Sequence, residues 1–297
     1  MWYEERDKHL QMPLLTMTDS RKNSLLCPNC RRLISRDETR CPWCGISHPG
    51  SRLKGLLSGR LFQSPDQLLQ LLIGANVVMY ILSLLLNPRM AGMAMNPFHF
   101  LSPDNRSLLL LGATGTLPID TLGRWWSLIS ANYLHGSLLH ILFNMLALRQ
   151  LAPLVSQEFG TARLFAIYTL SGVGGYLLSY LAGVPFTIGA SAAVCGLIGA
   201  LLYYGKHRGG GYGQELFRQV GGWAIGIFLF GFLVPGINNW GHGGGMAAGA
   251  LVAMLLGYRE RHGETFSHKA LAGCCAVVTF AILLWATLTA LFYRFGG

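Results

Sequence analysis

Two apolar stretches each contain one side chain that could take part in covalent catalysis. Residues 189–200 read GASAAVCGLIGA, with the hydroxyl of Ser191 near their start, and residues 238–249 read NNWGHGGGMAAG, with the imidazole of His242. A serine hydroxyl is a weak nucleophile until a base removes its proton, and a histidine with a pKa near neutrality is suited to that task. Because the apolar segments contain no carboxylate, the pair predicts acyl transfer by a Ser–His dyad rather than a triad.

A third stretch could supply the hydrogen-bond donors that acyl transfer needs at the developing oxyanion. Residues 135–148 read HGSLLHILFNMLAL, and in them His140 and Asn144 lie four positions apart, on one face of a helix. The first backbone N–H groups of a helix that begins near Ser191 also lack partners within that helix. We therefore expect His140, Asn144 and the backbone N–H of Ser191 to be the oxyanion donors, whereas His135 is expected only to order the loop.

The composition indicates which elements hold these side chains. The chain of 297 residues is 52% hydrophobic and 12% charged, whereas about a quarter of the residues in a soluble domain are charged. Its apolar residues form runs close to the length of about 20 residues that crosses a bilayer. This pattern predicts an all-α polytopic membrane protein. The expected spans are residues 67–86, 134–152, 162–182, 189–204, 219–235, 240–257 and 270–292.

The distribution of charge predicts the orientation in the membrane. Residues 1–60 contain 11 Lys and Arg against 6 Asp and Glu, and no apolar stretch near Met1 resembles a signal peptide. The connections 183–188 and 235–239 carry no charge, whereas the connections on the opposite side are basic. Since Lys and Arg accumulate on the cytoplasmic side, we expect a cytoplasmic N-terminus and an outside C-terminus in the plasma (inner) membrane. The net charge of +10 then reflects topology and anionic lipid headgroups, with no nucleic-acid partner.

This orientation predicts that the polar groups converge. The second, fourth and sixth spans then run inward from the outer face, with Ser191 and His242 a few residues from the start of theirs. His140 and Asn144 are expected about 6 and 10 residues into the second span, or roughly 9 and 15 Å at helical rise. All four are expected in the outer half of the bilayer. Rows of small residues favour close helix packing there, namely Gly241, Gly245 and Gly249 on the sixth span and Gly189, Gly196 and Ala200 on the fourth.

A different chemistry is expected near the N-terminus, at about residues 25–46. Cys27 and Cys30 form one C-x-x-C pair and Cys41 and Cys44 form another, a spacing that suits four thiolates around a structural Zn²⁺. A reducing compartment disfavours disulfides. With all four positions occupied by protein ligands, this zinc-ribbon-like module has no open site for catalysis and is expected to fold with its metal. It could dock a cytosolic partner or only stabilise the N-terminus.

Over roughly residues 65–260, these motifs resemble the rhomboid intramembrane serine proteases. GASAAVCGLIGA resembles the nucleophile motif G-x-S-G, HGSLLHILFNM is similar to the pattern H-x-x-x-x-H-x-x-x-N, and GHGGGMAAG resembles the motif of the base histidine. LGRWWSLISANYLH resembles the family's long first loop, with Arg124, Trp125 and Trp126 as its Trp/Arg element; alternatively, these tryptophans only anchor the chain at the interface.

The resemblance implies a six-helix rhomboid-like catalytic core at 65–260, followed by a seventh span at 268–297. It implies that Ser191 is the nucleophile, His242 the base, and His140 and Asn144 the oxyanion donors. It further implies cleavage of transmembrane protein substrates near the outer face of the bilayer without a catalytic cofactor. Trypsin-like specificity is not implied, because no acidic pocket residue is present.

The sequence departs from the family pattern directly after the nucleophile, where Ala192 replaces the usual glycine. If that position requires a positive φ or close approach of a substrate, the methyl group interferes. The Trp/Arg element also differs, with Arg124 before the two tryptophans. Residues 235–239, PGINN, directly precede His242 and are short enough to act as a cap over it.

Three other readings remain. Ser191 could be structural, bonding a carbonyl one turn back or holding two helices together. The whole chain could be a catalytically silent rhomboid-like protein that binds transmembrane helices without cutting them. A transporter or channel ranks last, because the spans show no obvious internal repeat and no acidic residue.

Overall fold

The computed structural model describes residues 24–30, 32–51, 64–87, 92–93, 100–260 and 263–295. The chain divides into two compact units, Met1–Gly55 and Leu56–Gly297, which are described separately. The predicted cytoplasmic segment falls partly on residues 1–23 and 52–63, outside the described residues.

The N-terminal unit is built around a short hairpin. Strand β1 (Ser24–Leu26) pairs antiparallel with β2 (Leu33–Ser35), with Leu25 opposite Ile34. Ile34 is buried together with Cys27 and Cys41. Domains with a core this small usually require a disulfide or a metal, which is consistent with the predicted zinc site.

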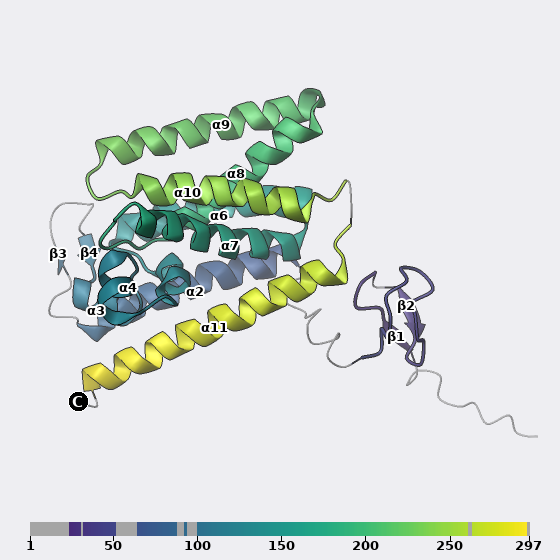
Figure 1. Ribbon diagram of the computed structural model, residues 1–297, viewed down its shortest axis with the longest axis horizontal. Coiled ribbons are helices and arrows are strands. Elements are labelled where there is room, and N and C mark those ends of the chain that lie inside the picture. Colours follow the sequence, from purple (N-terminus) through teal and green to yellow (C-terminus); the bar gives the residue numbers. More distant parts are fainter. Residues whose placement is uncertain are drawn as a thin grey trace, which may run out of the picture. The chain divides into compact units, whose positions relative to one another are not determined.

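The second unit is helical, as predicted (Figure 1). Its long helices are α2 (Pro65–Leu86), α6 (Leu138–Phe159), α7 (Thr161–Leu181), α8 (Ser191–Arg208), α9 (Gly210–Leu233), α10 (Asn239–Leu256) and α11 (Phe266–Phe295). Shorter elements lie between α2 and α6: β3 (Gly92–Met93), β4 (Phe100–Ser102), α3 (Asn105–Leu110), α4 (Thr116–Leu122), α5 (Ser127–Ser130) and the 3₁₀ turn η5 (Ala131–Tyr133).

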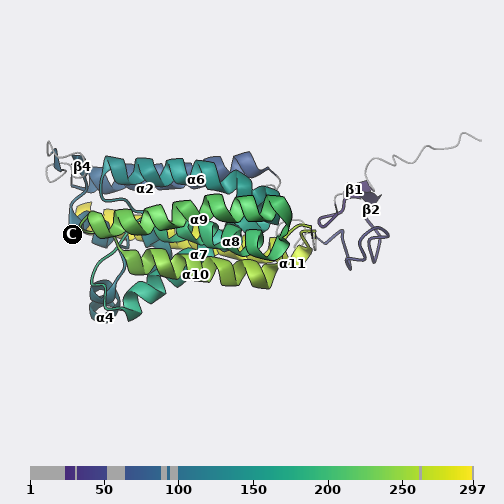
Figure 2. The same cartoon turned by 90° about the horizontal axis from the view of Figure 1, so that it is seen from above.

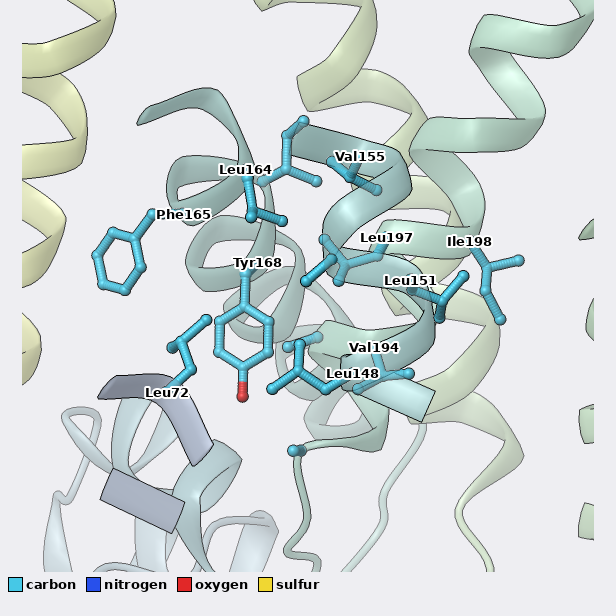
Figure 3. Close-up of a cluster of buried hydrophobic side chains, with 14 of the residues drawn as sticks. Leu72, Leu148, Leu151, Val155, Leu164, Phe165, Tyr168, Val194, Leu197 and Ile198 are labelled. Carbon is cyan, nitrogen blue, oxygen red and sulfur yellow. The ribbon is translucent and has the colours of Figure 1, made fainter. Parts of the chain in front are cut away.

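Helices α7, α8 and α10 form the centre of the helical unit and pack against one another. Helix α9 packs beside α8, and α11 lies along α7 on the other side of the unit (Figure 1). The view from above shows α2 and α6 on one side of α7 and α8, and α10 on the other (Figure 2). Apolar side chains from α2, α6, α7 and α8 fill the space between these helices, including Leu72, Leu148, Leu151, Val155, Leu164, Tyr168, Val194 and Leu197 (Figure 3).

Among the described residues, five helices are long and apolar enough to cross a membrane, namely α2, α6, α7, α9 and α11. Helices α8 and α10 fall outside this group. Helix α8 ends in Lys206, His207 and Arg208, and α10 begins with polar residues. Helix α8 is mostly buried among other helices, so its surface need not be as apolar as that of a lipid-facing helix, whereas α10 leaves Leu251, Met254 and Leu255 exposed. The seven-span topology therefore stays a prediction.

The predicted start of the second span, residue 134, is wrong. Helix α6 begins at Leu138, because the hydroxyl oxygen of Ser137 accepts a hydrogen bond from the backbone N–H of His140 at 3.2 Å and caps the helix. It then continues past Pro153 to Phe159. His140 and Asn144 are thus the third and seventh residues of the helix, nearer its start than the predicted depths.

Two other boundaries also differ from the prediction. Helix α8 begins at Ser191 rather than 189, because Gly189 has a φ of +126° that no helix accommodates. Helix α9 begins at Gly210, before the predicted start at 219, since its first turns are polar and a hydropathy pattern does not register them.

Candidate active site and metal centre

Ser191 is the first residue of α8, and the loop that delivers it is fixed on both sides. The N–H of Gly189 donates to the carbonyl oxygen of Ala131 at 2.9 Å. The hydroxyl of Tyr176, on α7, donates to the carbonyl oxygen of Gly189. Tyr176 could not be selected from the sequence, because one tyrosine in an apolar span has no distinguishing pattern.

The space beside Gly189 brings two predicted site residues together. A Cβ atom at this position would lie 2.7 Å from Nε2 of His140 and 3.6 Å from Oγ of Ser191. The imidazole and the hydroxyl therefore border the same small volume. Glycine is needed here for two reasons, its positive φ and the room it leaves for the histidine ring.

A backbone contact sets the hydrogen-bonding state of His140. Its Nδ1 accepts from the N–H of Gly136 at 3.3 Å. A neutral imidazole that accepts at Nδ1 carries its hydrogen on Nε2. The nitrogen nearest Gly189 and Ser191 is therefore a donor, as an oxyanion site requires.

His135 lies against His140, although the sequence assigned it only a loop-ordering role. The two ring centroids are 5.1 Å apart in an edge-to-face arrangement. His135 is fully buried, and in the described structure neither of its ring nitrogens has a hydrogen-bond partner. The ring thus supports one side of His140 by packing.

Asn144 lies one turn further along α6 and is buried. Its Nδ2 donates to the carbonyl oxygen of His140 at 2.9 Å, which leaves the second hydrogen of that amide for another acceptor. The structure therefore places His140 directly beside the nucleophile loop and Asn144 one turn further along α6.

His242 lies in the first turn of α10 and is 7% exposed. Its Nδ1 is buried and has no partner among the described residues. Ser191 and His242 both belong to the described part of the chain, and no hydrogen bond joins their side chains. Catalytic hydrogen bonds are often long before substrate binds.

The backbones of α8 and α10 touch next to this pair, as the small residues predicted. A methyl group added at Gly245 would overlap the carbonyl oxygen of Ala192, and one added at Gly249 would overlap that of Gly196. On α7, a Cβ at Gly175 would lie 2.6 Å from the carbonyl oxygen of Gly241. Gly175, which no motif of the sequence marked, lets α7 approach both helices.

The methyl group of Ala192 is accommodated. Ala192 lies within α8 with a helical backbone, so the position does not require a positive φ. Its side chain is buried beside Tyr176, and a Cβ at Gly175 would lie 3.0 Å from it. The absent side chain at Gly175 thus makes room for the methyl group.

The Trp/Arg element anchors the segment before α6. Arg124 donates from Nη1 to the carbonyl oxygen of Leu109 at 2.7 Å, and its guanidinium lies 5.8 Å from the ring centroid of Trp126. The ring of Trp125 packs edge-on against Tyr180 at 5.1 Å and is 51% exposed. Arg124 and Trp126 are therefore structural contacts within the unit, whereas Trp125 also presents a surface.

In the N-terminal unit, four cysteine sulfurs meet at one point. The Sγ atoms of Cys27, Cys30, Cys41 and Cys44 all lie within 4.8 Å of one another. The Cys27–Cys44 and Cys30–Cys41 separations are 3.6 and 3.7 Å, close to the edge of about 3.8 Å expected for a tetrahedron with Zn–S bonds of 2.3 Å. Gly45, with φ +73°, allows the turn after the last cysteine.

The thiols of this cluster differ in acidity: although burial opposes it, a hydrogen bond from the backbone N–H of Ile46 lowers the pKa of the Cys44 thiol to about 6. Burial raises the pKa of the Cys27 thiol to about 12, so without a metal it stays protonated at neutral pH. A bound cation stabilises thiolates instead. The donor set and its geometry fit a structural tetrahedral metal.

Comparison with known proteins places most of the helical unit in one family. Residues 122–259 match the rhomboid domain. The chain is 32% identical over 206 residues to RHOMBOID-like protein 4 of Arabidopsis thaliana, which covers 64% of this chain and 52% of that protein. It is 34% identical over 161 residues to Rhomboid protease GluP of Bacillus subtilis, covering 52% of this chain and 31% of that protein.

A shorter bacterial relative matches over more of its own length. The Putative rhomboid protease YdcA of Bacillus subtilis is 32% identical over 136 residues, which are 45% of this chain and 68% of that protein. The chain spans about half or less of the length of the plant protein and of GluP.

Proposed function

This chain belongs to the rhomboid family, and from that premise we propose that it is an intramembrane serine endopeptidase that cleaves transmembrane proteins. It is an integral multi-pass membrane protein. The observation that carries the proposal is the shared volume beside Gly189, which the hydroxyl of Ser191 and the Nε2 donor of His140 both border. A hydroxyl that only packed two helices would need no such donor.

In the first half of the reaction, Oγ of Ser191 attacks the carbonyl carbon of the scissile peptide bond while His242 takes the hydroxyl proton. The proton then passes from His242 to the leaving amine as the carbon–nitrogen bond breaks. The products of this half are an acyl-enzyme at Ser191 and a free amine. His242 is buried, and among the described residues its Nδ1 has no hydrogen-bond partner. This nitrogen is therefore not held by another group of the protein.

The tetrahedral oxyanion is held by two kinds of donor. Nε2–H of His140 supplies one, since Nδ1 of that ring is occupied by Gly136. The N–H of Ser191 supplies another, because the first backbone hydrogen bond of α8 runs from Val194 to Ala190, beyond the nucleophile. The positive end of the α8 dipole adds to both. Asn144 contributes through its second amide hydrogen.

In the second half, water attacks the acyl-enzyme with His242 as base, which releases the acid product and restores Ser191. Ser191 is partly exposed and His242 is 7% exposed, so water reaches the pair from one side. The loop at 235–239 caps this side. We place the site near the outer face, with the N-terminus in the cytoplasm and the cysteine module carrying Zn²⁺.

The test is reaction of the detergent-solubilised full chain with a fluorophosphonate probe, beside the variants Ser191→Ala and His242→Ala. We expect labelling of the wild type and loss of labelling in both variants. A folded wild type that does not react would contradict the proposal. It would favour a silent rhomboid-like protein in which Ser191 only packs helices.

A further inference from the structure

Asn238 makes three hydrogen bonds at the start of the helix that carries His242. Its Oδ1 accepts from the N–H of Gly241 at 3.0 Å, which caps α10. Its Nδ2 donates to Oγ of Ser179 at 2.8 Å and to Oγ1 of Thr187 at 3.0 Å. One carboxamide thus uses both of its polar atoms on three separate segments.

The first of these contacts fastens α10 to α7. Ser179 is fully buried in the last turns of α7, and its hydroxyl donates a hydrogen bond to the carbonyl oxygen of Gly175 at 3.0 Å. Gly175 is the glycine on which the backbones of Gly241 and Gly245 rest. The side chain of Asn238 therefore continues a contact that already holds the first turns of α10 in place.

The second contact reaches the loop that delivers the nucleophile. Thr187 lies four residues before Ser191, and its backbone N–H and carbonyl pair with Thr114 at 2.7 and 3.1 Å. Thr114 in turn accepts from the hydroxyl of Ser127 at 2.9 Å. The loop is thus a rigid support, and Asn238 connects α10 to it.

We propose that Asn238 is a positioning residue that sets His242 relative to Ser191, an inference that rests on the proposed function. His242 follows Asn238 by one helical turn. A shift in the position of the first turn of α10 therefore moves the imidazole directly. The amide forms a bridge between the helix of the base and the loop of the nucleophile. Misplacement by about 1 Å can cost a hundredfold in rate.

The experiment measures the kinetics of fluorophosphonate labelling for the full-length wild type, Asn238→Ala, Asn238→Asp and Thr187→Val. We expect Asn238→Ala to lower the saturating labelling rate by about tenfold to a hundredfold, with an unchanged half-saturating probe concentration. Thr187→Val lowers it less, and the double variant is no slower than Asn238→Ala. Asn238→Asp recovers only part of the rate, because a carboxylate still caps Gly241 and can accept from the hydroxyl of Thr187, whereas the one hydrogen of Ser179 is already donated to Gly175.

Asn239→Ala is the matched control. Asn239 is the adjacent residue of the same type, and among the described residues its Oδ1 has no hydrogen-bond partner. We expect this variant to label at the wild-type rate. The melting temperature of every variant is recorded, and the labelling rate is referred to the folded fraction.

Failure of the positioning role and failure of the proposed function give different labelling results. Wild-type labelling that disappears in Ser191→Ala, together with an unchanged rate in Asn238→Ala, would overturn the positioning role and leave the proposed function intact. An equal loss in Asn238→Ala and Asn239→Ala would also overturn it. Absence of labelling in the folded wild type would remove the proposed function and this inference with it.

Discussion

Gly189 and His140 approach so closely that residue 189 cannot carry a side chain. Nε2 of His140 lies 2.7 Å from the place where a Cβ of residue 189 would stand, and φ at this residue is +126°. The ring enters space that every other amino acid would fill. This relationship connects α6, the second long helix of the unit, to the nucleophile loop.

Gly189→Ala should abolish labelling of Ser191, because the methyl group displaces the imidazole of His140 in addition to straining the backbone. Gly183→Ala is the control, since Gly183 also has a positive φ, +77°, but has nothing within 4 Å of its added Cβ. Both changes should cost about 1–3 kcal/mol of folding free energy. Labelling by the probe should be lost in the first variant alone, and equal loss in both would contradict the explanation.

His140→Ala should slow labelling more than Asn144→Ala does. Removal of one oxyanion donor lowers the rate about 10²–10³-fold. His140 directs Nε2–H toward Gly189, whereas Asn144 already donates one amide hydrogen to the carbonyl oxygen of His140. We expect the full loss for His140 and a smaller one for Asn144. The saturating labelling rates of the two variants decide the order, and the reverse order would make Asn144 the main donor.

Ala192→Gly should leave labelling unchanged. The residue is helical and buried, and its N–H is retained in either form. Glycine inside a helix costs about 1 kcal/mol relative to alanine, so the melting temperature should fall slightly. A large gain in labelling rate would show that the methyl group obstructs the probe.

The N-terminal unit should bind one zinc ion per chain. Metal analysis of the purified protein should show this stoichiometry, and Cys41→Ser should abolish it, because Cys41 supplies one of four convergent sulfurs. Labelling of Ser191 should not change, since every group in the proposed site belongs to the helical unit. Retention of one zinc ion by Cys41→Ser would place the metal elsewhere.

The loop before α10 should act as a cap whose moving part is short. Asn238 fixes its end to Ser179 and Thr187, which leaves Pro235, Gly236 and Ile237 to move. Gly236 has φ +87° and open space around it, so Gly236→Asn should stiffen the loop without a clash. Cleavage of a transmembrane substrate should slow while the melting temperature stays constant, and proportional changes in both would argue against a cap.

The sequence alone determined the class of fold and predicted the chemistry. The four-cysteine spacing predicted a cluster that the structure forms, and the long apolar runs predicted the helices. The residues Ser191, His140 and His242 could be selected because polar groups are costly inside apolar segments and therefore few. The glycines of α10 predicted its close contact with α8, since small residues are what such contacts require.

The tertiary structure alone decided how these groups meet. The start of α6 depends on the cap at Ser137, which moved His140 and Asn144 closer to the helix end than hydropathy indicated. Tyr176, Gly175 and Asn238 act through contacts with residues distant in the chain, and a single sequence contains no local pattern that marks such contacts. Periodicity records which face of a helix is apolar, whereas hydrogen bonds between segments depend on distances that only packing sets.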